Sequence, residues 1–231
     1  MPIYNREDEY IKLLSAKSYT VKELSEALFI SEPTVRRDIV TMKEKKLVLC
    51  KRGVVCLETA SPDRRIPMFI RDLENMDKKM IIAKKASEHI RDGQVIMLDA
   101  STTAYCILSV LGEFKNLFVI TSGAKTAIAL AAMGIRTLCT GGELANESFS
   151  FIGNDAEKTL SKYNADIAFF SCRGVSSDGL ATDTSINENS IRKIMMKNSE
   201  KSFLLCDKSK MGNKYLNTLC SIEEVSGVIT N

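Results

Sequence analysis

From Lys78 onward the sequence alternates between short, almost continuous apolar runs and stretches in which apolar residues recur at helical spacing. Continuous apolar runs are typical of strands covered on both faces, and their alternation with helices is typical of a parallel sheet with crossover helices. The predicted strands are 95–98, 117–120, 135–138, 167–170, 203–205 and 228–229. This pattern predicts an α/β fold with a mostly parallel sheet for the larger part of the chain.

The beginning of the chain has a different pattern, with three short helical stretches. Apolar residues at helical spacing predict a first helix over 6–16. Thr20 with Glu23 has the spacing of a capping box at the start of a second helix. Ser31 is expected to cap a third helix, with Pro33 in its first turn. Three short helices with a tight turn before the third predict a helix-turn-helix.

The run that follows the third helix is typical of two short strands that turn at Arg52-Gly53, which would make the module winged. We therefore predict a winged helix-turn-helix domain over 1–57 that binds DNA. A linker and connecting helix are predicted over 58–76, and an α/β domain over 77–231.

The excess positive charge of the chain is confined to this first segment. Residues 1–56 contain 11 Lys and Arg against 8 Asp and Glu, whereas residues 57–231 contain 21 of each kind. A basic excess that coincides with a helix-turn-helix points to DNA phosphate as the partner.

The third helix has the two faces that a recognition helix needs. Its inward face is an apolar stripe of Val35, Ile39 and Met42. The arginines between these residues can form bidentate hydrogen bonds with guanine or with phosphate oxygens. The alternative is that Arg36-Arg37-Asp38 is a solvated helix face with a local salt bridge. The predicted DNA-contact residues are Ser31, Glu32, Thr34, Arg36, Arg37, Thr41, Lys51 and Arg52.

The string Ser31-x-x-Thr34-Val35-Arg36-Arg37-Asp38-Ile39, preceded by Val21-x-Glu23-Leu24-Ser25, resembles the helix-turn-helix of DeoR-type transcriptional regulators. The wing of that family usually carries His-Gly-Gly-Ala, where this chain has Arg52-Gly53-Val54-Val55. The change keeps the turn glycine and adds a charge. The resemblance implies a DNA-binding regulator, most often a repressor of a carbohydrate-metabolism operon.

The second half also resembles the DeoR family over nearly its full length. Such sensor domains are similar in fold to ribose-5-phosphate isomerase and to sugar-phosphate deaminases, and the resemblance implies a phosphorylated sugar as effector. The strings that carry the resemblance are Asp92-Gly93-x-x-Ile96-x-Leu98-Asp99-x-Ser101-Thr102, Gly141-Gly142, Thr182-Asp183-Thr184-Ser185-Ile186 and Asp207-Lys208-Ser209-Lys210-x-Gly212.

Polar residues follow several predicted strands at the carboxyl edge of the sheet, where ligands of open α/β folds bind. The hydroxyls and N–H groups after Asp99 can hold a phosphate at the start of a helix, and Asp99 can accept from a sugar hydroxyl. The alternative is an ordinary N-cap at Ser101 and an ordinary exposed turn at Asp207-Lys208. The predicted effector-binding residues are Asp99, Ser101, Thr102, Thr103, Ser122, Arg173, Glu188 and Lys208.

Some residues of this edge depart from the family pattern. Ala100 stands where glycine is common, Ser122-Gly123 where asparagine usually follows Thr121, and Ser171-Cys172-Arg173 where a glycine and a small residue are usual. These departures leave open a different ligand or a pocket without a sugar phosphate.

Several kinds of site are not expected. The 7 cysteines are dispersed, and His89, the only histidine, is expected at the surface, so neither a disulfide framework nor a metal site is predicted. We expect no cofactor and no catalytic residue. No apolar run is long enough to span a bilayer and the start lacks the layout of a signal peptide, so a cytoplasmic location is expected.

Three functions remain to be compared. The first is a regulator that binds operator DNA as a homo-oligomer, dimer or tetramer, under control of the effector. The second is a sugar-phosphate isomerase or deaminase with an appended domain, for which the candidate bases are Asp99, Asp166, Asp183 and Glu188. The third is a scaffold for oligomerisation without a ligand.

Overall fold

The computed structural model describes residues 6–45, 47–51, 53–57 and 68–231. The chain forms two compact units, Met1–Glu74 and Asn75–Asn231. The greater part of the predicted linker 58–76 lies outside the described residues.

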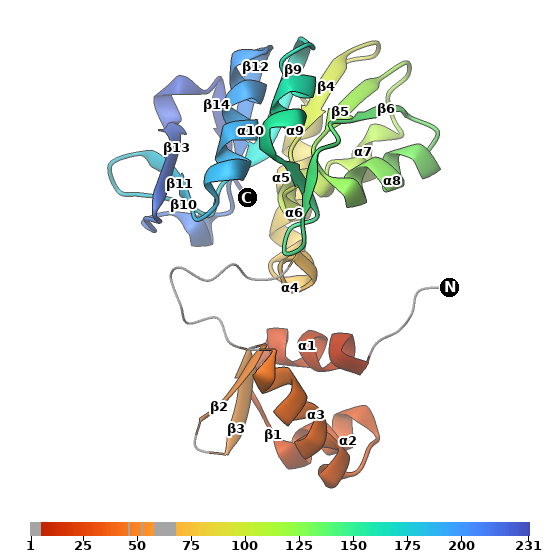
Figure 1. Cartoon of the computed structure of the whole chain (residues 1–231), viewed down its shortest axis with the longest axis vertical. Coiled ribbons are helices and arrows are strands. Elements are labelled where there is room, and N and C mark those ends of the chain that lie inside the picture. The colour runs from red at the N-terminus through yellow and green to blue at the C-terminus, as the bar shows by residue number, and fades with distance from the viewer. Residues whose placement is uncertain (1–5, 46, 52, 58–67) are drawn as a thin grey trace. The chain divides into compact units, whose positions relative to one another are not determined.

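The smaller unit is a helical domain with a short antiparallel sheet (Figure 1). Strand β3 pairs with β2 on one side and with β1 on the other. Gly53, between β2 and β3, has a φ of 81°, which glycine adopts without a steric penalty. The described elements are α1 (Arg6–Ala16), β1 (Tyr19–Thr20), α2 (Val21–Leu28), α3 (Glu32–Glu44), β2 (Val48–Lys51), β3 (Val54–Leu57) and α4 (Met68–Leu73).

Helices α1, α2 and α3 enclose one apolar core. Val35, Ile39 and Met42 of α3 are buried in it together with Tyr10 of α1 and Leu24 of α2. The predicted inward stripe of the third helix is therefore confirmed. The predicted helix-turn-helix is confirmed as well, and the two predicted strands form a hairpin after it.

The larger unit is built around a six-stranded parallel sheet with the strand order β14-β12-β9-β4-β5-β6 (Figure 1). Each of the six predicted strands is present in this sheet, so the predicted α/β fold is confirmed. Its strands are β4 (Val95–Leu98), β5 (Phe118–Thr121), β6 (Arg136–Cys139), β9 (Ala165–Ser171), β12 (Ser199–Leu205) and β14 (Gly227–Ile229).

Two separate apolar cores cover the two faces of the sheet. Successive side chains of a strand point to opposite faces, so Ile96 and Leu98 lie in one core and Met97 in the other. Helices α5 (Met76–Ser87), α6 (Thr102–Tyr105), α7 (Leu108–Leu111) and α8 (Ala124–Ala132) contribute to the first core. Helices α9 (Gly153–Leu160) and α10 (Ile186–Lys197) contribute to the second.

Short antiparallel elements that the sequence pattern did not predict stand beside the main sheet. Strands β7 (Glu143–Ala145) and β8 (Ser150–Ile152) form a hairpin. A three-stranded sheet has the order β10-β11-β13. Its strands are β10 (Gly174–Val175), β11 (Leu180–Asp183) and β13 (Asn217–Ser221), and the two short 3-10 helices are η1 (Lys208–Lys210) and η2 (Ile222–Glu224).

Among the described residues, every helix is too short or too polar to cross a membrane.

Candidate DNA interface and effector site

Helix α3 starts directly after the turn that ends α2, and its first turn carries three of the predicted DNA-contact residues. Ser31 occupies the N-cap position, and Pro33 lies where a missing N–H removes no helical hydrogen bond. The Ser31 hydroxyl lies 2.9 Å from the Thr34 hydroxyl and makes no cap hydrogen bond. Ser31 is therefore the N-cap residue, as predicted, but its hydroxyl pairs with another hydroxyl instead of a helix N–H.

Asp38 faces the body of the domain rather than the arginines beside it. Its Oδ2 accepts a hydrogen bond of 3.2 Å from the Tyr10 hydroxyl and lies 3.2 Å from Nη1 of Arg6. Burial, and then the Asp38 carboxylate, raise the pKa of the Tyr10 phenol above its usual range. Asp38 therefore joins α3 to α1, and the local ion pair of this helix face is formed by Arg36 with Glu32 instead.

The outward face of α3 is left with exposed cations. Arg36 and Arg37 are both exposed, and Arg36 lies 3.3 Å from Glu32 one turn earlier. Thr41 is exposed and its hydroxyl donates to the Arg37 carbonyl. A surface ion pair of the Arg36–Glu32 kind contributes only about 0.3 to 0.5 kcal/mol. Both arginines can therefore turn to a phosphate or a base at little cost.

The wing is described only in part. Lys51 is the last residue of β2, and its backbone pairs with Val54. Arg52, the other predicted contact residue of the wing, lies outside the described residues.

Asp99 lies at the carboxyl end of β4 and has both carboxylate oxygens occupied. Its Oδ1 accepts from the N–H and the hydroxyl of Ser101, at 3.1 and 2.5 Å. Its Oδ2 accepts from the N–H of Ser171, which ends β9. The Ser101 hydroxyl in turn accepts from the N–H of Ala104 and caps α6. These bonds favour a structural role for Asp99 over the expected contact with a sugar hydroxyl.

Arg192 of α10 joins Asp99 to two further carboxylates. Its Nε lies 2.9 Å from Asp99, its Nη1 2.8 Å from Asp183, and its Nη2 3.1 Å from Glu188. The residue is 4% exposed. The other oxygen of Glu188 accepts a hydrogen bond of 2.7 Å from Ser148. One guanidinium therefore ties the end of β4 to the end of β11 and to the first turn of α10.

The electrostatics of this cluster follow from burial and from the opposite charges. Burial acts to lower the pKa of Arg192, but the carboxylates of Asp183, Asp99 and Glu188 raise it further, so its guanidinium stays charged. Burial acts to raise the pKa of Asp183. Arg192 and the N–H groups of Thr184 and Ser185 outweigh burial and hold that pKa below its usual range.

Buried hydroxyls without a hydrogen-bond partner lie close to the same edge. Ser122 follows β5, Thr140 follows β6 and Thr126 lies in the first turn of α8; among the described residues none of these three hydroxyls has a partner. A Cβ added at Gly123 would lie 2.8 Å from Thr126 Oγ1 and 3.1 Å from Ala100 Cα, so the segments after β4 and β5 approach closely there. Buried hydroxyls normally bond to protein, water or a ligand. These three can therefore accept a polar ligand.

The side chains of the two lysines of η1 have different surroundings. Lys208 is exposed, and its N–H donates to the side chain of Asn231. Lys210 instead places its ammonium 3.0 Å from the Ser171 hydroxyl and 2.7 Å from the Cys172 carbonyl. Lys210 thus occupies the position at the sheet edge that the sequence pattern assigned to Lys208. The Arg173 guanidinium lies over the ring of Tyr215, at 4.9 Å.

The structure brings only some of the predicted effector residues together. Asp99 and Glu188 meet at Arg192, and Ser101 joins them through its bonds to Asp99; Thr102 and Thr103 are buried in α6. Ser122 belongs to the group of free hydroxyls. The sequence pattern did not identify five polar residues of this edge: Arg192, Lys210, Ser148, Thr126 and Thr140. The spacing of four residues between Glu188 and Arg192 on one helix could have indicated their ion pair.

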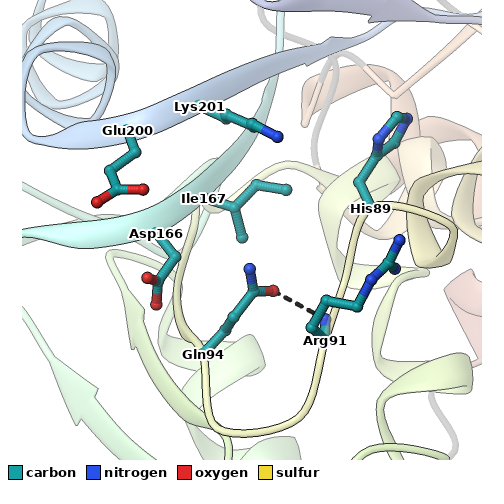
Figure 2. Close-up of a pocket in the computed structure, with 7 residues that line it drawn as sticks. All are labelled: His89, Arg91, Gln94, Asp166, Ile167, Glu200 and Lys201. Atoms are coloured by element: carbon teal, nitrogen blue, oxygen red, sulfur yellow. Dashed lines mark hydrogen bonds between the residues drawn. The ribbon is translucent and has the colours of Figure 1, made fainter.

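A pocket of about 180 Å³ lies at the opposite, amino end of the strands (Figure 2). It is lined by basic and acidic side chains, and the residues are His89, Arg91, Gln94, Asp166, Ile167, Glu200 and Lys201. His89 is exposed and its ring stacks on Phe203 at 4.3 Å, which agrees with its expected place at the surface. Asp166 accepts a hydrogen bond of 2.6 Å from the N–H of Val95, and so fixes the start of β4.

The four carboxylates considered as catalytic bases do not form one centre. Asp99, Asp183 and Glu188 are all bound to Arg192, and Asp166 lies at the other edge of the sheet. Within the described residues, no group of three or more His, Cys, Asp and Glu side chains is placed to hold a metal ion.

Two family models match the chain. One, described as a DeoR-like helix-turn-helix domain, matches residues 6–59, and the other, described as the DeoR C terminal sensor domain, matches residues 74–231.

Several curated relatives are similar over nearly their whole length. An uncharacterized HTH-type transcriptional regulator of Bacillus subtilis, YulB, is 32% identical, covering 100% of this chain and 90% of the relative. A lactose phosphotransferase system repressor of Staphylococcus epidermidis is 29% identical, covering 99% and 92%. The glycerol-3-phosphate regulon repressor of Escherichia coli is 27% identical, covering 98% and 90%. These relatives are named as regulators and repressors, not as enzymes.

Solved structures share the fold at low identity. A translation initiation factor eIF-2B of Pyrococcus horikoshii has a TM-score of 0.52 and 14% identity, covering 96% of this chain and 86% of the other. At this identity the likeness concerns the fold alone.

Proposed function

This chain belongs to the DeoR family of transcriptional regulators, and we propose that it represses a carbohydrate-metabolism operon under the control of a phosphorylated sugar. The observation that carries the proposal is the outward face of α3. Asp38 is turned inward to Arg6 and Tyr10, which leaves Arg36 and Arg37 exposed beside the first turn of the helix. A core-packed helix with exposed cations on its outer face is what a DNA-reading helix requires.

We assign the contacts on DNA to α3 and the wing. Arg36 and Arg37 are suited to bidentate bonds with guanine or with phosphate, and Thr34 to a phosphate or a thymine methyl. Glu32 can accept from a cytosine amino group once Arg36 turns away. The remaining proposed contact residues are Ser31 and Thr41 of the helix region and Lys51 and Arg52 of the wing.

The test of DNA binding starts from operator sequences selected out of genomic fragments with the full chain. Affinity for the selected operator and for a scrambled duplex is then measured by fluorescence anisotropy. Arg37→Ala is expected to weaken operator binding by about 1 to 3 kcal/mol. Lys162→Ala, which removes an exposed cation from the larger unit, serves as the control. Equal affinity of the unchanged protein for operator and scrambled DNA at physiological salt would contradict the proposal.

For the effector we propose a site at the carboxyl edge of the sheet. The ammonium of Lys210 and the three unpartnered hydroxyls of Ser122, Thr126 and Thr140 supply donors suited to a phosphate and to sugar oxygens. Asp99, Ser101 and Glu188 then shape the site through Arg192, whereas Thr102 and Thr103 pack beside it. Arg173 and Lys208 are proposed at its margin. The relatives named for the lactose phosphotransferase system and for glycerol 3-phosphate support a phosphorylated ligand.

The effector test is a thermal-shift screen of the full chain against a panel of phosphorylated sugars. A ligand at 100 times its dissociation constant stabilises the folded protein by about 2.7 kcal/mol. Lys210→Ala should abolish the shift, whereas Lys208→Ala should reduce it little because Lys208 is exposed. If no phosphorylated sugar shifts the Tm while the oligomer stays intact, the larger unit is a scaffold for oligomerisation without a ligand. Turnover of any compound in the panel would instead favour the isomerase alternative.

We further propose that the protein binds DNA as a homo-oligomer, a dimer or a tetramer. A single helix-turn-helix reads one half-site, and two copies are needed to read two half-sites a helical turn apart. Sedimentation of the protein with a two-half-site operator gives the number of copies. Binding of one copy per operator would contradict this part of the proposal.

A further inference from the structure

The turn between α2 and α3 contains a phenylalanine with an unusual backbone conformation and an exposed ring. Phe29 has φ and ψ of 53° and 40°, in the left-handed region, and it is 94% exposed. The left-handed conformation is needed there because the Phe29 N–H bonds back to the Glu26 carbonyl and the Ile30 N–H to the Ser25 carbonyl, which ends α2. Glycine fills such a position without a steric penalty, whereas a bulky residue there is strained.

Among the described residues, burial of the Phe29 ring does not offset this strain. Phe149, the other left-handed phenylalanine among the described residues, is only 43% exposed, so more than half of it is covered. Asn75 and Asn116 are also left-handed, but asparagine tolerates that region. Phe29 alone of these four combines a bulky side chain with almost complete exposure. Residues held in such strained backbone conformations cluster at functional positions.

The location of Phe29 indicates which partner covers its ring. It precedes Ser31 by two residues, so the two Cα atoms are at most about 7.6 Å apart. Ile30 packs against the core of the domain, and the Ser25 hydroxyl donates to its carbonyl, which fixes the chain on either side of the exposed ring. Ser31, Glu32 and Thr34 are the proposed reading end of α3. When this end enters the major groove, the ring of Phe29 is brought to the DNA with it.

We propose that Phe29 is a DNA-contact residue whose ring packs on an apolar surface of the operator, and this inference rests on the DNA-binding function proposed above. Duplex DNA offers two such surfaces beside the groove, the C5-methyl groups of thymine and the carbons of deoxyribose. The ring then complements Arg36 and Arg37: the arginines bind polar edges and phosphates, and Phe29 excludes water from an apolar neighbour.

The test uses the opposite effects of Phe29→Gly on stability and on binding. Glycine relieves the left-handed strain and removes no buried surface, so the Tm of the free protein should stay unchanged or rise. Affinity for the selected operator should nevertheless fall about tenfold, the size of a lost base contact. Phe29→Asn, which also tolerates the left-handed region, should weaken binding equally, and Phe29→Tyr should retain it. Ile128→Ala, which removes a side chain 73% exposed on α8, should leave affinity unchanged.

Operators in which deoxyuridine replaces thymidine distinguish the two apolar surfaces. If the ring contacts a thymine methyl, the substitution weakens binding of the unchanged protein more than that of Phe29→Gly, which keeps only the thymine contact proposed for Thr34. If the ring contacts deoxyribose, the substitution affects both proteins alike while Phe29→Gly still loses about tenfold in affinity.

Two results would overturn the inference. One is a Phe29→Gly protein that binds the operator as tightly as the unchanged protein. The other is a change in the sedimentation of the DNA-free protein on Phe29→Gly, which would assign the ring to a protein–protein contact. Either result leaves the proposed function intact as long as the unchanged protein discriminates operator from scrambled DNA. Loss of that discrimination would remove both.

Discussion

Arg192 has one donor group for each of three carboxylates, and these come from three places in the chain. Asp99 ends β4, Asp183 ends β11 and Glu188 lies one turn before Arg192 on α10. Removal of one partner from a buried charge cluster is costly because the remaining charges lose both water and their counter-ion. Arg192 is therefore the residue on which the geometry of the candidate effector site depends most.

Arg192→Met is expected to destabilise the protein by about 3 to 5 kcal/mol, because three buried carboxylates lose their cation. Urea unfolding followed by circular dichroism measures the change. Lys193→Met, at the exposed neighbouring position on the same helix, should have little effect. Similar stability of the two variants would show that the carboxylates are neutralised in another way.

The lowered pKa of Asp183 predicts a loss of stability in acid. Because the folded pKa lies below the ordinary value of about 3.9, the unfolded chain takes up the proton first, and stability falls as pH falls. The contribution is complete above pH ~4 and is lost as pH falls through the lowered folded pKa. In urea unfolding measured from pH 5 downward, the free energy of unfolding of Asp183→Asn should depend less steeply on pH than that of the unchanged protein. Parallel curves for the two proteins would contradict this assignment.

Residue-level prediction from the sequence succeeded for the inward stripe of α3 and failed for the polar contacts. Val35, Ile39 and Met42 follow from helical spacing alone. The 3-10 helix η1 determines that Lys210 rather than Lys208 faces the sheet. Such a short helix leaves no periodic pattern in the sequence from which this could be predicted. The role of Arg192 was not predicted because the sequence of an amphipathic helix does not distinguish a buried arginine from an exposed one.

At the scale of elements, helix α2 is held at its start by a complete capping box. The Thr20 hydroxyl accepts from the N–H of Glu23, and the Glu23 carboxylate accepts from the N–H of Thr20 at 2.7 Å. This element was predicted from the sequence because capping depends on residues three apart. The bonds set where α2 begins and therefore where the turn to α3 falls.

Thr20→Ala is expected to cost about 1 kcal/mol of stability, since it removes the acceptor for a helix N–H. Amide hydrogen exchange of α2 measures the change within the smaller unit. Ser18→Ala, two residues before, is the matched control because this exposed serine lies outside α2. Unchanged exchange in Thr20→Ala would contradict a stabilising role for the capping box.

The six strands of the main sheet were predictable, whereas the small strands were not. Burial on both faces makes β4, β5 and β9 almost continuously apolar, and that signal survives in the sequence. Strand β10 has two residues, and β11 ends in Thr182-Asp183, so neither has a clear apolar pattern. β11 pairs with β13, far along the chain, and local patterns do not contain that contact; β10 in turn pairs with β11.

At the scale of the whole molecule, the two units carry the two proposed activities, DNA binding in one and effector binding in the other. Regulation requires that the effector and the operator change each other's affinity. The coupling is a property of the complete chain and is measured on the complete chain.

The compound that stabilises the protein in the thermal-shift screen should change operator affinity by about 5- to 150-fold. The operator should change the affinity for that compound by the same factor, because binding free energies are linked. Anisotropy titrations with and without the compound, and calorimetric titrations with and without the operator, give the two factors. Unequal factors would mean that the compound also binds DNA or a second site.

The division of the sheet into two cores has a consequence for how the protein can diverge. Met97 lies in one core, while Ile96 and Leu98, its neighbours in the sequence, lie in the other. Substitutions in groups that share no partners are nearly additive in their effect on stability. Substitutions can therefore repack the core under α5 to α8 with little effect on the second core, to which α10 contributes.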